Sequence, residues 1–166
     1  MKFKSILFIL SILFLFGCKE NFEVWKDYND NYLTEKTQEQ KLRTSNTGLR
    51  FKIIAQGKGA IPKQNSRVKI SYSAFLCDGT ICSSLDTIDY VYNYPIGIQQ
   101  ALKQMNRESI WQLCIPYDLA YGVSGTKNTY GNYIIPPYST IFIKSIELKE
   151  VINYWLACVR NYSTAY

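Results

Sequence analysis

The chain has 166 residues, of which 47% are apolar or aromatic, carries a formal net charge of +6 and contains no histidine. The missing histidine excludes a Ser-His-Asp triad, a Cys-His nucleophile pair and any metal site with a histidine ligand. Lysine and arginine are scattered along the chain rather than clustered, so we expect a solvated basic surface, no nucleic-acid partner, no metal and no other cofactor.

Residues 1–17 have the pattern of an export signal. Two lysines precede an apolar run, Ile6 to Phe16, whose 11 residues are too few to cross a bilayer, where about 20 are needed. The run ends at Leu15-Phe16-Gly17-Cys18, which resembles a bacterial lipobox. That resemblance implies cleavage before Cys18 and lipidation of this cysteine, whereas the alternative is an ordinary export signal with an incidental cysteine. Loss of residues 1–17, with their two lysines and no acidic residue, lowers the net charge from +6 to +4.

Residues 18–47 form a polar, charged stretch that carries several aromatic side chains. Trp25, Tyr28, Tyr32 and Leu33 recur near the helical period and predict a short amphipathic helix. We expect residues 18–47 to be a lipid-anchored spacer that is partly helical, and a helix that docks weakly on the domain is the alternative.

Short strands dominate the chain after this spacer. Alternating or continuous apolar residues bounded by turn residues predict strands at Leu49–Ile54, Val68–Cys77, Thr80–Ser83, Tyr90–Tyr94, Ile110–Ile115 and Thr140–Leu148. Ile98, Leu102 and Met105 are spaced by four and three residues and predict one helix among them. Several strands and one helix indicate an α+β fold, with the short α-helix packed across one face of an antiparallel sheet.

Asp78-Gly79 is a strong signal for a two-residue hairpin turn, and Cys77 and Cys82 lie on either side of it. Such a turn would place these two cysteines diagonally, about 7–8 Å apart, which is usually too far for a disulfide. No Cys-x-x-Cys spacing suggests a redox or metal site. We therefore expect free thiols.

A series of short motifs between residues 48 and 151 occurs in one order. The series is Tyr72, the Asp78-Gly79 turn, Gly97 before the helix, Ile115-Pro116, Ala120-Tyr121-Gly122, Ile134-Ile135-Pro136-Pro137, Ser139-Thr140 and Glu147-Leu148. It resembles the FK506-binding (FKBP-type) peptidyl-prolyl isomerase family, in particular its bacterial lipoprotein members. The resemblance implies an FKBP-like fold, a twisted antiparallel sheet wrapped across a single short α-helix, over residues 48–151. Residues 152–166 lie beyond it as a C-terminal tail.

The activity that this resemblance implies is cis-trans rotation of X-Pro bonds in exported proteins. The barrier to rotation about a peptide bond is ~18–20 kcal/mol, and no bond is made or broken during the rotation. The reaction therefore needs no nucleophile, general base or cofactor. It needs a dry pocket that suits the twisted, less dipolar imide better than the planar one.

The resemblance also implies the residues of this pocket. It assigns the catalytic surface to Tyr72, Tyr92, Ile98, Tyr121, Ile134, Ile135 and Ile143. Tyr121 matches the tyrosine whose hydroxyl binds the ligand carbonyl, and Ile135 matches the residue whose backbone amide does the same. On periodicity alone, Tyr72, Tyr92 and Ile143 would be ordinary core positions on strands.

The chain departs from the family pattern at three pocket positions. Cys82 and Ser83, which we expect at the substrate-binding surface, stand where the family has Phe-Asp, and Ile98 stands where a tryptophan is common. One extra residue also precedes Glu147. These departures favour the alternative function, a catalytically weak or inactive FKBP-fold chaperone or binding lipoprotein.

The implied partners are proline-containing segments of unfolded exported proteins and, through the N-terminal lipid, a membrane. We expect a monomer. Lys19, which follows the lipidated cysteine, favours the outer membrane of a diderm bacterium, at its periplasmic or its surface face.

Overall fold

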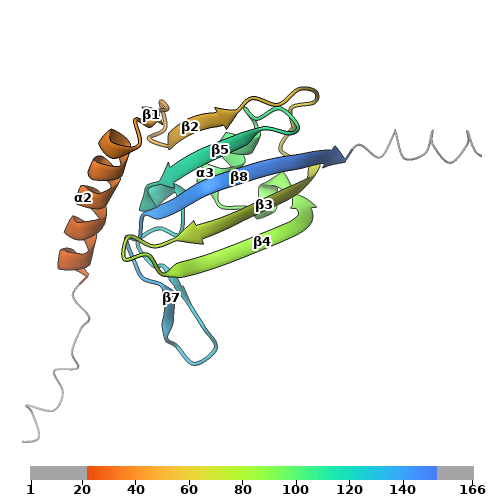
Figure 1. Ribbon diagram of the computed structural model, residues 1–166. Coiled ribbons are helices and arrows are strands. Elements are labelled where there is room, and N and C mark those ends of the chain that lie inside the picture. Colours follow the sequence, from red (N-terminus) through yellow and green to blue (C-terminus); the bar gives the residue numbers. More distant parts are fainter. Residues whose placement is uncertain (1–21, 153–166) are drawn as a thin grey trace, which may run out of the picture.

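A twisted antiparallel sheet organises residues 22–152, the part of the chain that the computed structural model describes. Its strand order is β1-β2-β5-β8-β3-β4 (Figure 1). The bounds are β1 (Arg43–Thr44), β2 (Arg50–Ala55), β3 (Arg67–Phe75), β4 (Ile81–Tyr90), β5 (Ile110–Ile115) and β8 (Ile141–Ile152). A small hairpin of β6 (Thr126–Lys127) and β7 (Tyr133–Ile135) projects from one end.

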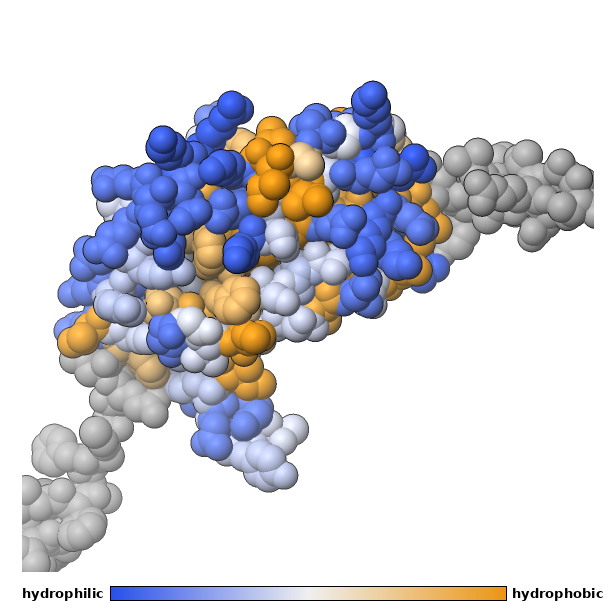
Figure 2. All heavy atoms as spheres, in the orientation of Figure 1, coloured by the Kyte–Doolittle hydropathy of each residue, from blue (hydrophilic) through white to orange (hydrophobic). Residues whose placement is uncertain are grey.

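The sheet buries one face against helix α3 (Ile96–Leu102). Strand β3 shows the reason, because its side chains alternate between buried and half-buried and Val68, Ile70 and Tyr72 all point to the inner face. Helix α3 lies behind the sheet in Figure 1 and contributes Ile98 and Leu102 to the same core. Figure 2 looks onto the other face, which shows mainly hydrophilic and intermediate residues. The predicted α+β fold, with a short helix across one sheet face, is confirmed.

Helix α3 lies unusually close to β5 because Gly97 has no side chain. A Cβ atom added there would be 2.4 Å from Cγ2 of Ile115 and 3.2 Å from the carbonyl oxygen of Leu119. Gly97 therefore allows the helix to touch both the end of β5 and the segment that follows it.

Strand β8 contains a bulge between Ile143 and Ile146. Both residues are fully buried although they are three positions apart, and Lys144 and Ser145 between them are exposed. The pairing of β8 with β3 and with β5 shifts register here. An extra residue in one strand produces such a bulge. The bulge accounts for the additional residue before Glu147.

Two local predictions for the hairpin region were wrong. The turn has three residues, Cys77–Gly79, because Leu76 N–H donates to the Thr80 carbonyl at 2.8 Å, and Gly79 takes the left-handed φ of +86° that such a turn requires. The returning strand β4 does not stop at Ser83 but continues to Tyr90.

The strand predicted at Tyr90–Tyr94 is instead a 3₁₀ turn, η1 (Val91–Asn93). Tyr94 N–H donates to the Val91 carbonyl at 3.3 Å, which closes the turn directly before Pro95 and helix α3. The alternating tyrosines misled the prediction, because a tight turn before a helix can carry the same residues.

Helix α2 (Glu23–Glu39) is the helix expected in residues 18–47, and it docks on the sheet body. Its buried residues are Asn29 and Leu33, and Leu33 packs with Leu42 and Cys114. This arrangement is the docking alternative rather than a free spacer. None of the helices between residues 22 and 152 is long and apolar enough to span a membrane.

Substitution Gly97→Ala tests the close contact between α3 and β5. Alanine normally stabilises a helix relative to glycine by about 1 kcal/mol, but here its Cβ would overlap Ile115. We expect the opposite sign, a loss of about 1–3 kcal/mol in the free energy of unfolding, measured by urea denaturation. The exposed Ile96→Ala on the same helix is the control, and a Gly97→Ala variant at least as stable as wild type would contradict the contact.

Candidate functional site

The segment after β5 brings Tyr121 to the inner face of the sheet. The 3₁₀ turn η2 (Tyr117–Leu119) follows Pro116, and Gly122 N–H donates to the Tyr117 carbonyl at 2.7 Å, which closes the loop. Leu119 is buried in the main core, and Tyr121 is half-buried and packs against that core. The loop therefore uses Leu119 as its anchor and presents Tyr121 beside it.

Residues 136–140, the proline-rich segment after β7, lie against this loop. Tyr138 N–H donates to the Gly122 carbonyl at 3.1 Å, so the two segments are joined by a backbone hydrogen bond. Gly125 is required at the crossing, because an added Cβ would be 2.2 Å from the carbonyl oxygen of Ile135. Ile135 itself is buried in the main core.

Tyr72 belongs to the buried core cluster on the inner face, and Tyr121 and Cys82 pack against that cluster. Tyr72 is 6% exposed, and burial raises the pKa of its hydroxyl, an effect that a hydrogen bond with the Ser83 side chain partly offsets. Burial, with smaller contributions from Tyr72 and Cys82, raises the pKa of Tyr121 to about 12. Both phenols are therefore neutral near physiological pH and can donate hydrogen bonds.

Cys82 and Ser83, for which the family resemblance implies Phe-Asp, lie at the start of β4. The Cys82 thiol donates to the Ala74 carbonyl at 3.5 Å, and burial raises its pKa above the usual range. The Cys82 thiol is thus held in its neutral form. Ser83 supplies a polar contact to Tyr72, as an acidic residue could, but without a charge.

Tyr94 lies in the same cluster, although it was not among the predicted site residues. It is 7% exposed, lies in the main core with Tyr72 and Ile98, and burial raises its pKa to about 12, with smaller contributions from Asp89 and Tyr72. Its hydroxyl is buried without a hydrogen-bond partner among the described residues. The signal in the sequence was Pro95, because a residue before proline is extended and can point inward at a helix start.

The other predicted site residues separate into two groups. Ile98, Ile135 and Ile143 are at most 3% exposed and lie beneath Tyr72 and Tyr121 in the same core. Ile134 is 49% exposed at the rim, and Tyr92 is 51% exposed. The Tyr92 ring stacks on Tyr90 at 5.1 Å, so the structure does not bring Tyr92 into the cluster. The η1 turn that replaces the predicted strand is the reason.

The chemistry open to this cluster is binding, desolvation and hydrogen bonding. Residues 22–152 contain no group of histidine, cysteine or acidic side chains suited to a metal ion. A cavity of about 440 Å³ opens on the outer sheet face, where Ser73 and Asp86 line it together with the apolar side chains of Phe75 and Leu85. We place the candidate site on the inner face, because Tyr121 and Ile135 pack there with the main core and neither of them lines that cavity.

Comparisons with known proteins identify relatives of this chain. The chain is 32% identical over 139 residues to the FKBP-type 22 kDa peptidyl-prolyl cis-trans isomerase of Escherichia coli K12, and the match covers 81% of this chain and 65% of that protein. It is 30% identical to the outer membrane protein MIP of Legionella longbeachae, over 75% of this chain and 54% of that protein. The chain thus spans less than two thirds of the length of these curated relatives.

The fold has close counterparts among solved structures. The crystal structure of a peptidyl-prolyl cis-trans isomerase from Pseudomonas syringae pv. tomato superposes with a TM-score of 0.71 at 24% identity, covering 82% of this chain and all of that one. The family model described as FKBP-type peptidyl-prolyl cis-trans isomerase matches residues 58–149, more than half of the chain and all of the cluster around Tyr72 and Tyr121. The chain belongs to the family of FKBP-type peptidyl-prolyl cis-trans isomerases.

Proposed function

We propose that this protein catalyses cis-trans rotation of X-Pro bonds, with the substrate proline bound on the inner sheet face between Tyr72, Tyr121 and Ile135. The observation that carries the proposal is the meeting of two neutral phenols above a buried apolar floor, within the region that matches the family. Ile98 and Ile143 supply that floor and Ile134 the rim. No group in the cluster has to react.

The mechanism rests on a difference in solvation between the planar and the twisted imide. The planar imide is stabilised by resonance and by hydrogen bonds from water to its carbonyl. Binding among apolar side chains removes that water, which raises the energy of the planar form more than that of the twisted one. The Tyr121 hydroxyl and the Ile135 backbone amide then hold the carbonyl groups of the substrate in one orientation.

The departures at Cys82 and Ser83 support a second candidate, a binding protein or chaperone of low catalytic activity. Tyr72, Ile98 and Ile135 are nearly inaccessible, and Tyr94 adds another buried ring beside them. A bound proline would therefore find most of its contacts at Tyr121, Cys82 and Ser83. The contact area of a cysteine is smaller than that of a phenylalanine, and substrate binding would be weaker in proportion.

The substrates that we propose are proline-containing segments of unfolded exported proteins, and the location is the cell envelope. The export signal in residues 1–17 and the relative named as an outer membrane protein support this placement. A lipid on Cys18 would attach the protein, as a monomer, to the outer membrane of a diderm bacterium.

Substitutions at Tyr121 test the catalytic proposal. In a protease-coupled assay on a proline tetrapeptide, the purified full-length wild-type protein should accelerate isomerisation. Tyr121→Ala should reduce kcat/KM by about tenfold or more, because it removes a wall and a hydrogen bond. Tyr121→Phe, which keeps the ring, should show a smaller reduction in kcat/KM. No acceleration by the wild-type protein would favour the binding function instead.

The pH dependence tests whether any ionisable group takes part. Burial raises the pKa values of Tyr72, Cys82 and Tyr121, so all three keep their protons beyond the usual range of these groups. The rate should therefore be constant between about pH 6 and pH 9. NMR exchange on a proline peptide can measure it without a coupling protease, which has a pH dependence of its own. A bell-shaped profile would show acid-base catalysis and contradict the mechanism.

Substitution Cys18→Ser tests the lipid anchor. The wild-type protein should incorporate labelled fatty acid in the cell envelope and should enter the detergent phase on phase separation. The variant should do neither, because acylation requires the thiol. Equal partitioning of the two proteins would show that Cys18 is an incidental cysteine.

A further inference from the structure

Helix α2 contacts the segment that carries Ile134 and Ile135 on both sides of these residues. Before them, the rings of Phe22 and Tyr133 meet edge to face at 5.3 Å. After them, Trp25 Nε1–H donates to Ser139 Oγ at 3.1 Å. The helix and the residue before it thus contact the chain on both sides of Ile134 and Ile135.

Asn29, one turn further along α2, makes the most buried of these contacts. It is fully inaccessible, and its Oδ1 accepts the backbone N–H of Thr140 at 2.7 Å. Its Nδ2–H donates to the Trp25 carbonyl at 2.8 Å, which fixes the orientation of the amide. A buried polar side chain whose hydrogen bonds all run to specific partners specifies one arrangement of the elements that it joins.

The contact at Ser139 continues toward the site. Ser139 Oγ accepts from Trp25 and donates to the carbonyl of Pro136 at 2.7 Å. Pro136 directly follows Ile135, whose backbone amide is the expected substrate donor. Hydrogen bonds therefore run from the helix to the residue next to the substrate contact.

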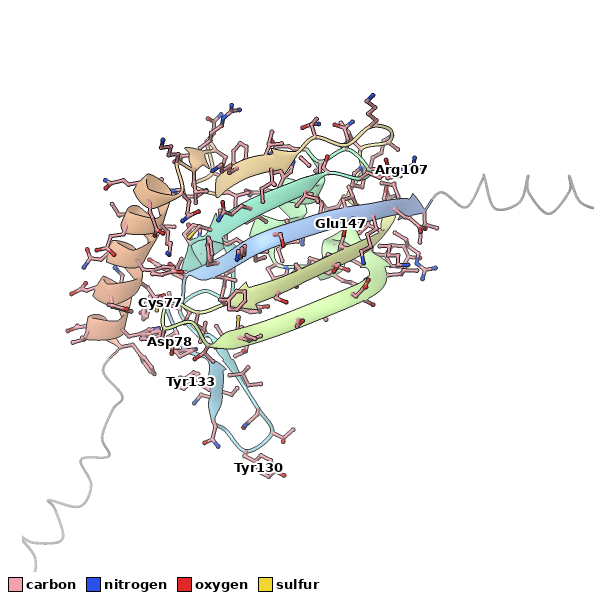
Figure 3. All side chains as sticks on the ribbon, viewed as in Figure 1. Cys77, Asp78, Arg107, Tyr130, Tyr133 and Glu147 are labelled. Atoms are coloured by element: carbon pink, nitrogen blue, oxygen red, sulfur yellow. The ribbon has the colours of Figure 1, made fainter. Side chains whose placement is uncertain are left out.

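The same asparagine reaches the other wall of the site. Burial raises the pKa of the Cys77 thiol, in the turn between β3 and β4, and the nearby Asn29 side chain partly offsets this rise. Figure 3 shows Cys77 and Asp78 beside α2, with Tyr133 near the start of that helix and Tyr130 at the far tip of the hairpin. The turn leads directly into Cys82 and Ser83.

We propose that α2 is a positioning element of the active site, in which Trp25 and Asn29 hold Ile134 and Ile135 at a fixed place relative to Tyr121. Neither residue touches the substrate. They act through the backbone at Pro136 and Thr140, which follow Ile134 and Ile135 in the chain. The catalytic consequence rests on the proposed isomerase function, whereas the structural consequence does not.

The helix offers a matched control for this proposal. Leu33 lies one turn beyond Asn29 on the same helix, and it packs with Leu42 and Cys114 rather than with the proline-rich segment. Leu33→Ala should weaken the docking of α2 without removing a contact to residues 133–140. Trp25→Phe is the mildest test variant, because it keeps a ring and removes only the indole donor.

Asn29→Ala, Trp25→Phe and Leu33→Ala would be compared in the full-length protein, at a temperature where circular dichroism shows all of them folded. We expect kcat/KM for a proline tetrapeptide to fall about five- to tenfold for Asn29→Ala and about two- to threefold for Trp25→Phe. For Leu33→Ala we expect a lower Tm and kcat/KM within about twofold of wild type. If Asn29→Ala does not fold, Trp25→Phe and Ser139→Ala provide the test. The reduction in kcat/KM for the double mutant of these two should be no larger than that for either single variant.

Amide chemical shifts of Ile134 and Ile135 provide a second readout that needs no activity. These shifts should move in Trp25→Phe and Asn29→Ala and stay in place in Leu33→Ala. Equal effects of all three variants, or unmoved shifts in the first two, would overturn the proposal. An inactive wild-type protein whose shifts nevertheless respond as expected would refute the isomerase function and leave the positioning role standing.

Discussion

Helix α3 is too short to cover the whole inner face of the sheet, and the candidate site results from this difference in length. Helix α3 has seven residues and is about 10 Å long, whereas β8 has 12 residues and extends about 40 Å. The part of the inner face that α3 leaves open must be shielded by connecting segments. The segment after β5 carries Leu119 and Tyr121 for this purpose, and the end of β7 carries Ile135. Side chains on loops leave a less complete cover than a helix would, and Tyr121 remains half-buried in this cover rather than fully enclosed.

Sequence patterns predicted the parts of the fold that follow from alternation and helical spacing. Strand β5 and the position of α3 are examples, because apolar periodicity reports directly which side faces the core. The length of β4 and the η1 turn were missed because their residues satisfy more than one backbone geometry. Tyr92 and Tyr94 illustrate the outcome. They are two positions apart, as residues on one face of a strand would be, yet only Tyr94 is buried. The docking of α2 was underestimated because its central contact is a polar residue, Asn29, and a search for apolar faces gives such a residue no weight.

The cluster at Tyr72 carries Cys82 and Ser83, where the family resemblance implies Phe-Asp. Ser83 retains a hydrogen bond to the Tyr72 hydroxyl that an aspartate could also make, and it removes a negative charge from the pocket. Cys82 leaves room where a phenylalanine ring would be, while the Tyr94 ring lies nearby in the same core. The phenols of Tyr72 and Tyr121 and the thiol of Cys82 are neutral, which suits a reaction whose transition state is less dipolar than its ground state.

The three cysteine thiols between residues 22 and 152 affect how well the protein resists an oxidising environment. Cys77 and Cys114 are buried, and burial raises their pKa values to about 11 and about 12, with Cys82 shifted in the same direction. Oxidants and mixed disulfides react with the thiolate, which these residues scarcely form. The folded body therefore shields its own thiols from oxidative damage and from wrong crosslinks. In a compartment without glutathione, that shielding would last only as long as the packing around these sulfurs remains intact.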